Sequence, residues 1–231
     1  MHSFHRRNVS RPSGGFTLVE LLVVIGIIAI LAGVALGPIT NGIRKAQESG
    51  AMQTCRTLAL AEFQFSNDNQ GSYPDGATAA IICEALMSGN YVSDPGMFYL
   101  SSDKIGATKA TTITSFQNGN DSFDFMGSGS GTTAQGVSSS APDQLPLVWS
   151  EGEAATDTVP AANTGTYFTP ANGIFGKDGV AVCYHSNNAF FRAPAPSTAT
   201  TKPAPTEITF IDQSFDPGSV TYTVRTAASG K

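Results

Sequence analysis

Gly14-Gly15-Phe16-Thr17-Leu18-Val19-Glu20 opens the stretch that decides the fold, because an apolar run follows it as far as Ile43. Within this run, Glu20 is the only charged residue before Arg44. From Leu21 to Ile43 there are about 23 residues, which as a helix span roughly 34 Å. This length is sufficient to cross the hydrocarbon core of a lipid bilayer, which is ~30 Å thick. A lone carboxylate costs about 2.5–3.5 kcal/mol near the bilayer centre and less near its edge, so we expect Glu20 to have a partner.

The composition fits an apolar anchor joined to one loop-rich domain. Of the 231 residues, 41% are hydrophobic and 13% are charged, whereas about 25% charged residues is usual in a soluble domain. The net charge is −5, and arginines gather in the first segment at Arg6, Arg7 and Arg11. We therefore expect no nucleic acid among the partners. The positive-inside rule predicts that residues 1–15 stay in the cytoplasm and that the chain from Arg44 onward is exported.

The small residues lie on the unusual side of the apolar run. A secretory signal carries its small residues after the apolar core, next to the cleavage site. Here residues 37–44 match that pattern poorly, and the small pair Gly14-Gly15 stands before the core instead. Cleavage after this pair removes only the basic leader, residues 1–15, and keeps the apolar helix.

The segment Gly15-Phe16-Thr17-Leu18-Val19-Glu20-Leu21 resembles the processing site of type IV prepilins and type II secretion pseudopilins, and the resemblance extends to about Ile43. It implies that the prepilin peptidase cuts after Gly15, that Phe16 is then N-methylated, and that Glu20 is the assembly residue. In a helical stack, Glu20 of one subunit would meet the Phe16 α-ammonium of another. Such a pair offsets both desolvation penalties and fixes the axial register between subunits.

Gly37-Pro38 marks a weak point in the apolar helix of residues 16–43. Proline lacks a backbone N–H and clashes with the preceding turn. We therefore expect a kink or local melting near residues 36–38. In pilin filaments a corresponding segment unwinds on assembly, and the resemblance implies the same for this chain.

Residues 44–67 are predicted to form the amphipathic half of the same helix, because apolar residues recur there near the helical spacing of 3.6. The predicted apolar stripe consists of Ile43, Ala46, Met52, Cys55, Leu58, Ala59 and Phe63. The predicted polar side consists of Arg44, Lys45, Gln47, Glu48, Gln53, Arg56 and Glu62.

Residues 68–231 are predicted to form an exported, loop-rich α+β domain. A short helix is expected over residues 77–88, and a hairpin is expected to turn at Ser186-Asn187-Asn188. The expected strands are 97–100, 111–116, 122–126, 145–149, 166–169, 180–185, 189–192, 207–211 and 219–225. The predicted fold is thus pilin-like: a long N-terminal helix packed on a C-terminal antiparallel sheet with long loops.

No catalytic pattern stands out, so we do not expect an enzyme. His185 is the only histidine after the leader, and its place at the end of a hairpin predicts an exposed side chain. The acids of Asp121-Ser122-Phe123-Asp124 and Glu151-Gly152-Glu153 are expected to be solvated loop residues rather than acid/base pairs.

Metal binding and disulfide formation are the remaining chemical questions. Major pseudopilins of type II secretion bind calcium in an acidic loop, and Asp178, Asp212 and Asp216 are the candidate oxygen donors here. We expect no cofactor, since no EF-hand spacing is present. The chain has an odd number of cysteines, Cys55, Cys83 and Cys183. Two of them could form a disulfide and leave one free thiol, or cysteines could be buried as small apolar side chains.

The resemblance implies a structural subunit of a type II secretion pseudopilus or a type IV pilus-like filament. Gly71-Ser72-Tyr73-Pro74 resembles the element after the spine helix of the major secretion pseudopilin, which favours the secretion filament, while a pilus or DNA-uptake filament stays open. The implied partners are other copies of the chain, the prepilin peptidase, the inner-membrane assembly platform and the membrane. The filament is expected in the periplasm or at the cell surface. The alternative is a single-pass anchored ectodomain that binds a ligand or catalyses a reaction without polymerising.

Overall fold

The computed structural model describes residues 15–103, 106–128, 136–151, 153–154, 167–169, 173–193, 208–209 and 222–225. The chain divides into two compact units, residues 1–45 and residues 46–231. The first unit contains the N-terminal part of helix α1 (Leu18–Asp68), and the second contains the remainder of α1 together with the other described elements.

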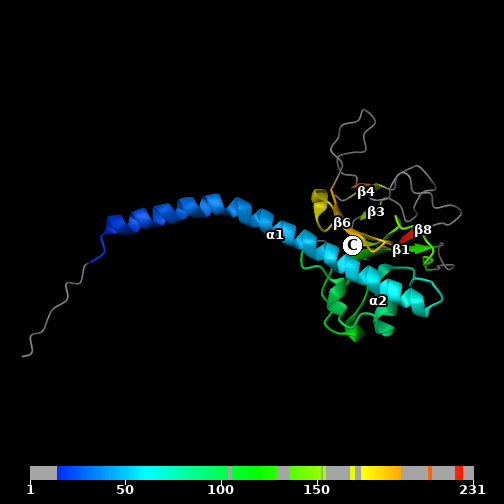
Figure 1. Ribbon diagram of the computed structural model, residues 1–231. Coiled ribbons are helices and arrows are strands. Elements are labelled where there is room, and N and C mark those ends of the chain that lie inside the picture. Colours follow the sequence, from blue (N-terminus) through cyan, green and yellow to red (C-terminus); the bar gives the residue numbers. More distant parts are fainter. Residues whose placement is uncertain are drawn as a thin grey trace, which may run out of the picture. The chain divides into compact units, whose positions relative to one another are not determined.

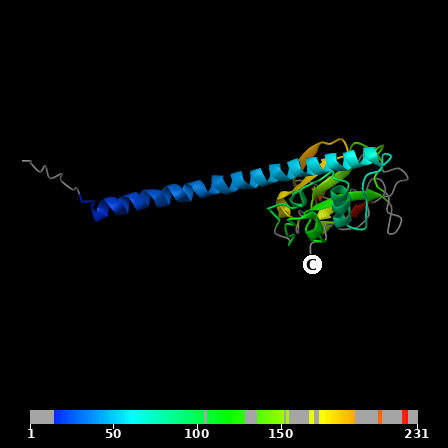
Figure 2. The same cartoon turned by 90° about the horizontal axis from the view of Figure 1, so that it is seen from below.

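Helix α1 confirms the predicted long N-terminal helix, and its C-terminal end, cyan in Figures 1 and 2, lies against the strands of the second unit. The helix stops because Gln70 and Gly71 adopt left-handed conformations, with φ of 57° and 80°. The Gly71 N–H then donates to the Ser66 carbonyl at 2.8 Å. This bond satisfies one of the carbonyls that a helix end leaves without a partner.

The second unit is built on a five-stranded antiparallel sheet in the order β6-β5-β2-β1-β8. Its strands are β1 (Phe123–Ser128), β2 (Pro146–Ser150), β5 (Val180–Tyr184), β6 (Ala189–Arg192) and β8 (Tyr222–Arg225). Strands β2 and β5 are buried at every position, which explains their almost continuous apolar sequences. The predicted hairpin is confirmed, because β5 pairs antiparallel with β6 across the turn at residues 185–188.

A second sheet of three short strands has the order β3-β4-β7, with β3 (Glu153–Ala154), β4 (Tyr167–Thr169) and β7 (Ile208–Thr209). The predicted short helix is confirmed as α2 (Ala79–Ser88). A further 3-10 turn, η5 (Gly176–Asp178), precedes β5. These elements complete the α+β fold that the sequence predicts.

Two predicted strands are wrong, because residues 97–100 and 111–116 contain the 3-10 helices η1 (Pro95–Phe98) and η2 (Ile113–Ser115). The Asp94 carboxylate accepts the Gly96 N–H at 2.8 Å ahead of η1. Thr112 and Ser115 form a reciprocal capping box around η2. Such local bonds from side chains to the backbone compete with strand pairing and outweigh the apolar composition of these short segments.

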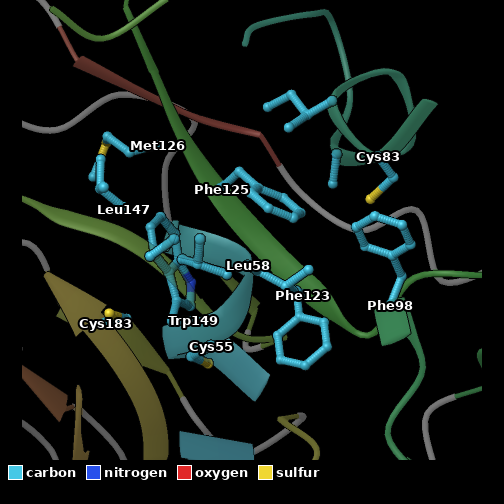
Figure 3. Packing of buried hydrophobic residues seen from close by; sticks show 14 of the residues in the cluster. Cys55, Leu58, Cys83, Phe98, Phe123, Phe125, Met126, Leu147, Trp149 and Cys183 are labelled. Carbon is cyan, nitrogen blue, oxygen red and sulfur yellow. The ribbon is translucent and has the colours of Figure 1, made fainter. Parts of the chain in front are cut away.

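The core of the second unit lies where α1 and α2 meet the strands. Figure 3 shows Cys55 and Leu58 of α1 in one cluster with Trp149 of β2, and Cys83 of α2 beside Phe98. All five side chains are fully buried. The core therefore joins the second part of the spine helix directly to the sheet.

The packed face of α1 differs from the predicted stripe at several positions. Cys55, Leu58 and Ala59 are buried as predicted, but Phe63 is 47% exposed, and Glu62, expected on the polar side, is only 1% exposed. Ile43 and Ala46, also predicted on the stripe, are exposed. The buried face follows small residues that let the helix approach the sheet closely. The apolar periodicity alone did not distinguish this face from the neighbouring one.

Glu62 is therefore an acid inside the core. Its Oε2 atom has no hydrogen-bond partner among the described residues. Burial, and to a lesser degree the negative charge of Asp75, raises the pKa of Glu62 well above its ordinary value. The side chain is thus held in its neutral, protonated form, which avoids the large cost of a buried charge.

A buried ion pair ties the segment after α1 to the last described strand. The Nε and Nη2 atoms of Arg225 donate to the two carboxylate oxygens of Asp75 at 2.8 Å and 3.2 Å. Both side chains are about 5% exposed or less. Asp75 also accepts the backbone N–H groups of Gly76 and Ser128, so its charge is well satisfied.

The three cysteines settle the question that their odd count left open. Cys55, Cys83 and Cys183 are all buried and all free. Burial raises the pKa of each thiol. They act as small apolar core residues rather than as members of a disulfide.

Candidate functional site

The N-terminal turn of α1 is closed by a capping box between Thr17 and Glu20. The Thr17 N–H and the Thr17 hydroxyl both donate to Oε2 of Glu20 at 2.8 Å, and the Glu20 N–H donates to Oγ1 of Thr17 at 3.2 Å. This arrangement satisfies helix N–H groups that otherwise lack partners. No role was predicted for Thr17, although Thr17-Leu18-Val19-Glu20 matches the Thr-x-x-Glu pattern of a capping box.

The apolar residues around this cap have no cover within the first unit. Large apolar side chains from Phe16 to Ile43 are between 45% and 86% exposed. Among the described residues, α1 is the one helix long and apolar enough to cross a membrane. Apolar side chains on every face of a helix need lipid or other helices around them.

Within the described part of the chain, Glu20 has hydrogen bonds but no countercharge. The two bonds from Thr17 reduce the cost of placing the carboxylate in apolar surroundings, yet they leave its negative charge in place. The backbone nitrogen of Phe16 belongs to a peptide bond in the uncut chain, so it carries no charge. Cleavage after Gly15 would convert this nitrogen into an α-ammonium.

At Gly37-Pro38 the helix runs on without a break. The Thr40 hydroxyl donates to the Gly37 carbonyl at 2.9 Å, a type of back-bond that often bends helices. The single subunit therefore shows no local melting here. The kink itself, and an unwinding on assembly, stay predictions.

Residues 10–36 match the prokaryotic N-terminal methylation motif. The chain carries a prepilin-type N-terminus. The predicted processing and assembly positions Gly15, Phe16 and Glu20 all lie inside this prepilin-type motif. With the apolar part of α1, the motif indicates a membrane-anchored, single-pass protein.

Curated relatives of the prepilin-type chain are pilins and fimbrial proteins. It is 35% identical over 83 residues to the type IV major pilin protein PilE of Neisseria gonorrhoeae, covering 35% of this chain and 48% of the relative. It is 38% identical over 80 residues to the fimbrial protein EcpC of Eikenella corrodens, covering 34% and 50%. It is 52% identical over 40 residues to the prepilin peptidase-dependent protein D of Escherichia coli (strain K12), covering 17% and 27%.

These likenesses have a limited extent. The chain spans about half the length of the curated pilin and fimbrial relatives it matches. No solved structure matches it. The fold of the second unit therefore comes from the structure described above rather than from a relative.

The calcium candidates are not brought together by the described part of the chain. Asp178 ends the 3-10 turn η5, while Asp212 and Asp216 lie outside the described residues. Within the described ranges no three histidine, cysteine or acidic side chains are grouped so that they could hold a metal ion.

The acids that were expected to be solvated are buried instead. Asp121 and Asp124 are fully buried and Glu151 is 7% exposed, while the side chain of Glu153 lies outside the described part. Asp124 lies opposite Trp149 in the β1–β2 register and accepts its indole N–H at 3.1 Å. Burial raises the pKa of Asp121 to about 6. The prediction failed because Asp121 precedes β1, Asp124 lies on it and Glu151 follows β2, and both are interior strands of the five-stranded sheet.

His185 is also not the exposed residue that was predicted. Its side chain is 10% exposed, and its ring centroid lies 5.5 Å from that of Tyr73. The hairpin turns back against α1 and the segment after it, which covers the imidazole. Its ring lines a pocket of the second unit.

Proposed function

We propose that this chain is a subunit of a pilus-like filament, processed after Gly15 and assembled through its N-terminal helix. The observation that carries the proposal is the methylation motif over residues 10–36 with Glu20 inside it. The Thr17–Glu20 capping box supports it, because it holds the carboxylate beside the future amino terminus.

The Glu20 carboxylate and the Phe16 α-ammonium of a neighbouring subunit would set the register of the filament. Each charge alone is costly in apolar surroundings, and the pair offsets that cost only when the two subunits are correctly aligned. Apolar packing between the helices supplies the remaining attraction. Leaving the bilayer requires an inner-membrane assembly platform, because roughly 20 apolar residues are already favourably placed in lipid.

A type II secretion pseudopilus is the form that the segment after α1 favours. Gly71, Tyr73 and Pro74 stand directly after the helix, as in the secretion pseudopilins that this element resembles. The leader then faces the cytoplasm, and the second unit lies in the periplasm or at the cell surface. The partners are other copies of the chain, the prepilin peptidase and the assembly platform.

Mass spectrometry of the mature amino terminus tests the processing step. The expected N-terminal peptide begins with a methylated Phe16, because cleavage after Gly15 creates the amine that Glu20 needs. A start at Met1, or after Gly37, would contradict the proposal and would favour an anchored ectodomain that does not polymerise.

The charge pairing is tested by Glu20→Gln, with Glu84→Gln on the exposed face of α2 as the matched control. Glutamine retains an oxygen that can accept the Thr17 N–H, so the helix cap survives while the charge is removed. We expect Glu20→Gln to be cleaved and inserted normally but to lose filaments, measured by shearing and immunoblotting, while Glu84→Gln assembles like the wild type. Normal filaments from Glu20→Gln would exclude the charge pair as the source of register.

A further inference from the structure

The turn that leads into β1 contains an asparagine whose side chain has no neighbour holding it. Asn118 and Gly119 are the central residues of this turn, which the Asn120 N–H closes by donating to the Gln117 carbonyl at 3.0 Å. Asn118 is exposed, and its side-chain amide makes no hydrogen bond within the described ranges. The Asn120 amide, by contrast, donates to the carbonyl and the hydroxyl of Thr108 at 2.7 Å and 2.9 Å.

The backbone nitrogen that follows Asn118 faces a buried carboxylate. The Gly119 N–H donates to Oδ1 of Asp121 at 3.3 Å. Asp121 is 0% exposed, and its Oδ2 atom has no hydrogen-bond partner among the described residues. Burial raises the pKa of Asp121 to about 6, so the carboxylate is ionised at pH 7 and is a stronger base than an exposed aspartate. It is therefore placed to accept the proton of the Gly119 nitrogen.

Glycine is the residue that leaves this nitrogen open to attack the side chain before it. Gly119 has φ of 92°, which residues with a Cβ rarely adopt. The absence of a side chain at Gly119 also removes the group that would otherwise crowd the approach of the Asn118 amide carbon. An exposed amide, an uncrowded nitrogen and a base on that nitrogen thus meet within four consecutive residues.

This combination is specific to one of the three Asn-Gly pairs in the chain, which are Asn41-Gly42, Asn118-Gly119 and Asn172-Gly173. Only in the second pair does an acid stand two residues after the glycine, whereas Arg44 and Phe175 take that place in the others. The first pair lies inside helix α1, where backbone N–H groups bond along the helix. Asn172 lies outside the described residues.

We propose that Asn118 is a site of self-modification, at which the chain converts its own asparagine into aspartate and isoaspartate with Asp121 as the base. The Gly119 nitrogen forms a bond to Cγ of Asn118 while its proton passes to Asp121. The Cγ–Nδ2 bond then breaks, and the amide nitrogen leaves as ammonia with one proton gained. Water opens the five-membered succinimide at either carbonyl. The net change replaces –NH2 by –OH, and no oxidant, reductant or cofactor takes part.

The inference goes beyond the proposed function and does not depend on it. Its product adds a negative charge beside the buried Asp121. The isoaspartate form also lengthens the backbone by one methylene group, which disturbs the bond between the Asn120 N–H and the Gln117 carbonyl. The turn before β1 would therefore change with the age of the molecule.

The test follows the full-length protein in detergent at neutral pH, in water enriched in heavy oxygen, by peptide mapping with mass spectrometry. Asp121→Asn keeps the shape of the side chain and removes the base, and Trp149 fluorescence checks that the second unit stays folded. The peptide that contains Asn172 is the internal control, because Asp121→Asn should leave its rate unchanged. Asn118→Gln should abolish the labelled product at this position.

The folded wild type is expected to incorporate the label at residue 118. Asp121→Asn should slow this reaction by about tenfold or more, a modest share of the ~100-fold or greater effect of a positioned base. In urea the wild type and Asp121→Asn should react alike at Asn118, because the unfolded chain no longer holds the carboxylate against the Gly119 nitrogen.

Equal rates for the folded wild type and folded Asp121→Asn would overturn the inference. If Asp121→Asn does not fold, the wild type alone decides. Its Asn118 should then react faster in the folded chain than in urea, and an Asn118 amide that survives folding but is lost in urea would show that the turn protects the side chain instead.

Discussion

The two parts of helix α1 differ in what surrounds them. From Leu18 to Ile43 the large apolar side chains are exposed, whereas Cys55 and Leu58 in the second part are fully buried. The sequence changes character at Arg44-Lys45, where charge returns. The first part has apolar residues on all its faces, and the second has one buried face against the sheet. One continuous helix thus has two different surroundings. Its second part stabilises a folded domain, and the apolar side chains of its first part need contact with lipid or with other helices.

The comparison separates two kinds of stability. Packing of the second part contributes to the unfolding free energy of one subunit. Contacts of the first part contribute only when a membrane or a filament is present. Substitutions in the two parts should therefore move different measurements, and Trp149, the chain's only tryptophan and fully buried, reports on the second unit alone.

The largest loss of stability is expected from Arg225→Met, which removes the buried ion pair of the second unit. Loss of this partner leaves the Asp75 carboxylate buried without a countercharge, which costs about 3–5 kcal/mol. We expect the second unit to unfold at much lower urea concentration, monitored by Trp149 fluorescence in detergent, while membrane insertion of the first part is unchanged.

Arg192→Met is the control for that experiment, because Arg192 is an exposed cation lying over the ring of Phe190 at 4.9 Å. Its loss should cost about 1 kcal/mol or less. Equal destabilisation by both substitutions would show that the Asp75–Arg225 pair does not hold the second unit together.

A matched pair of leucine substitutions sharpens the comparison. Leu58→Ala should lower the unfolding free energy of the second unit by about 2–5 kcal/mol, because it leaves a cavity in the core. Leu22→Ala, at a position 66% exposed in the single subunit, should change it by less than about 0.5 kcal/mol. Filament yield should respond in the opposite order when stability is restored by low temperature. A large effect of Leu22→Ala on urea unfolding would mean that the two parts of α1 are not independent.

Glu62, the buried acid in the second part of α1, is expected to make stability depend on pH. The pKa of Glu62 is higher in the folded chain than in the unfolded chain. Between these two pKa values the folded chain keeps a proton that the unfolded chain has lost, so the unfolding free energy falls as the pH rises. Glu62→Gln lacks this loss. Its unfolding free energy relative to the wild type should therefore increase as pH rises above the ordinary carboxyl range, by up to about 1.4 kcal/mol per pH unit. Urea unfolding at a series of pH values measures the difference, and a constant difference would show that Glu62 is ionised in the core.

Much of this architecture could be predicted from the sequence. The run before Arg44, the end of α1 near residue 68, the short helix α2 and the β5–β6 hairpin all have strong local signals. The motif that contains Gly15, Phe16 and Glu20 was likewise predictable, because the small pair, the aromatic residue and the lone acid lie close together in the chain.

The remaining features depend on contacts between distant segments. Glu62 and Phe63 are neighbours in the sequence, and only the position of the sheet decides that the acid is buried and the ring exposed. Asp75 forms an ion pair with Arg225, which lies 150 residues away in the sequence. No local sequence pattern predicts such a contact. His185 is covered because its hairpin folds back toward Tyr73. The role of Thr17, by contrast, was present in the sequence as a capping box and was overlooked.

The pairing of β8 with β1 has a consequence for folding during protein synthesis. Ribosomes add about 5–20 residues per second, so the stretch between Asp75 and Arg225 takes on the order of ten seconds to synthesise. Throughout that interval the edge of β1 that pairs with β8 has no neighbouring strand. The Asp75 carboxylate has no guanidinium partner either, so it must remain in water. The five-stranded sheet can therefore be completed only after the Arg225 guanidinium has been synthesised, near the end of the chain.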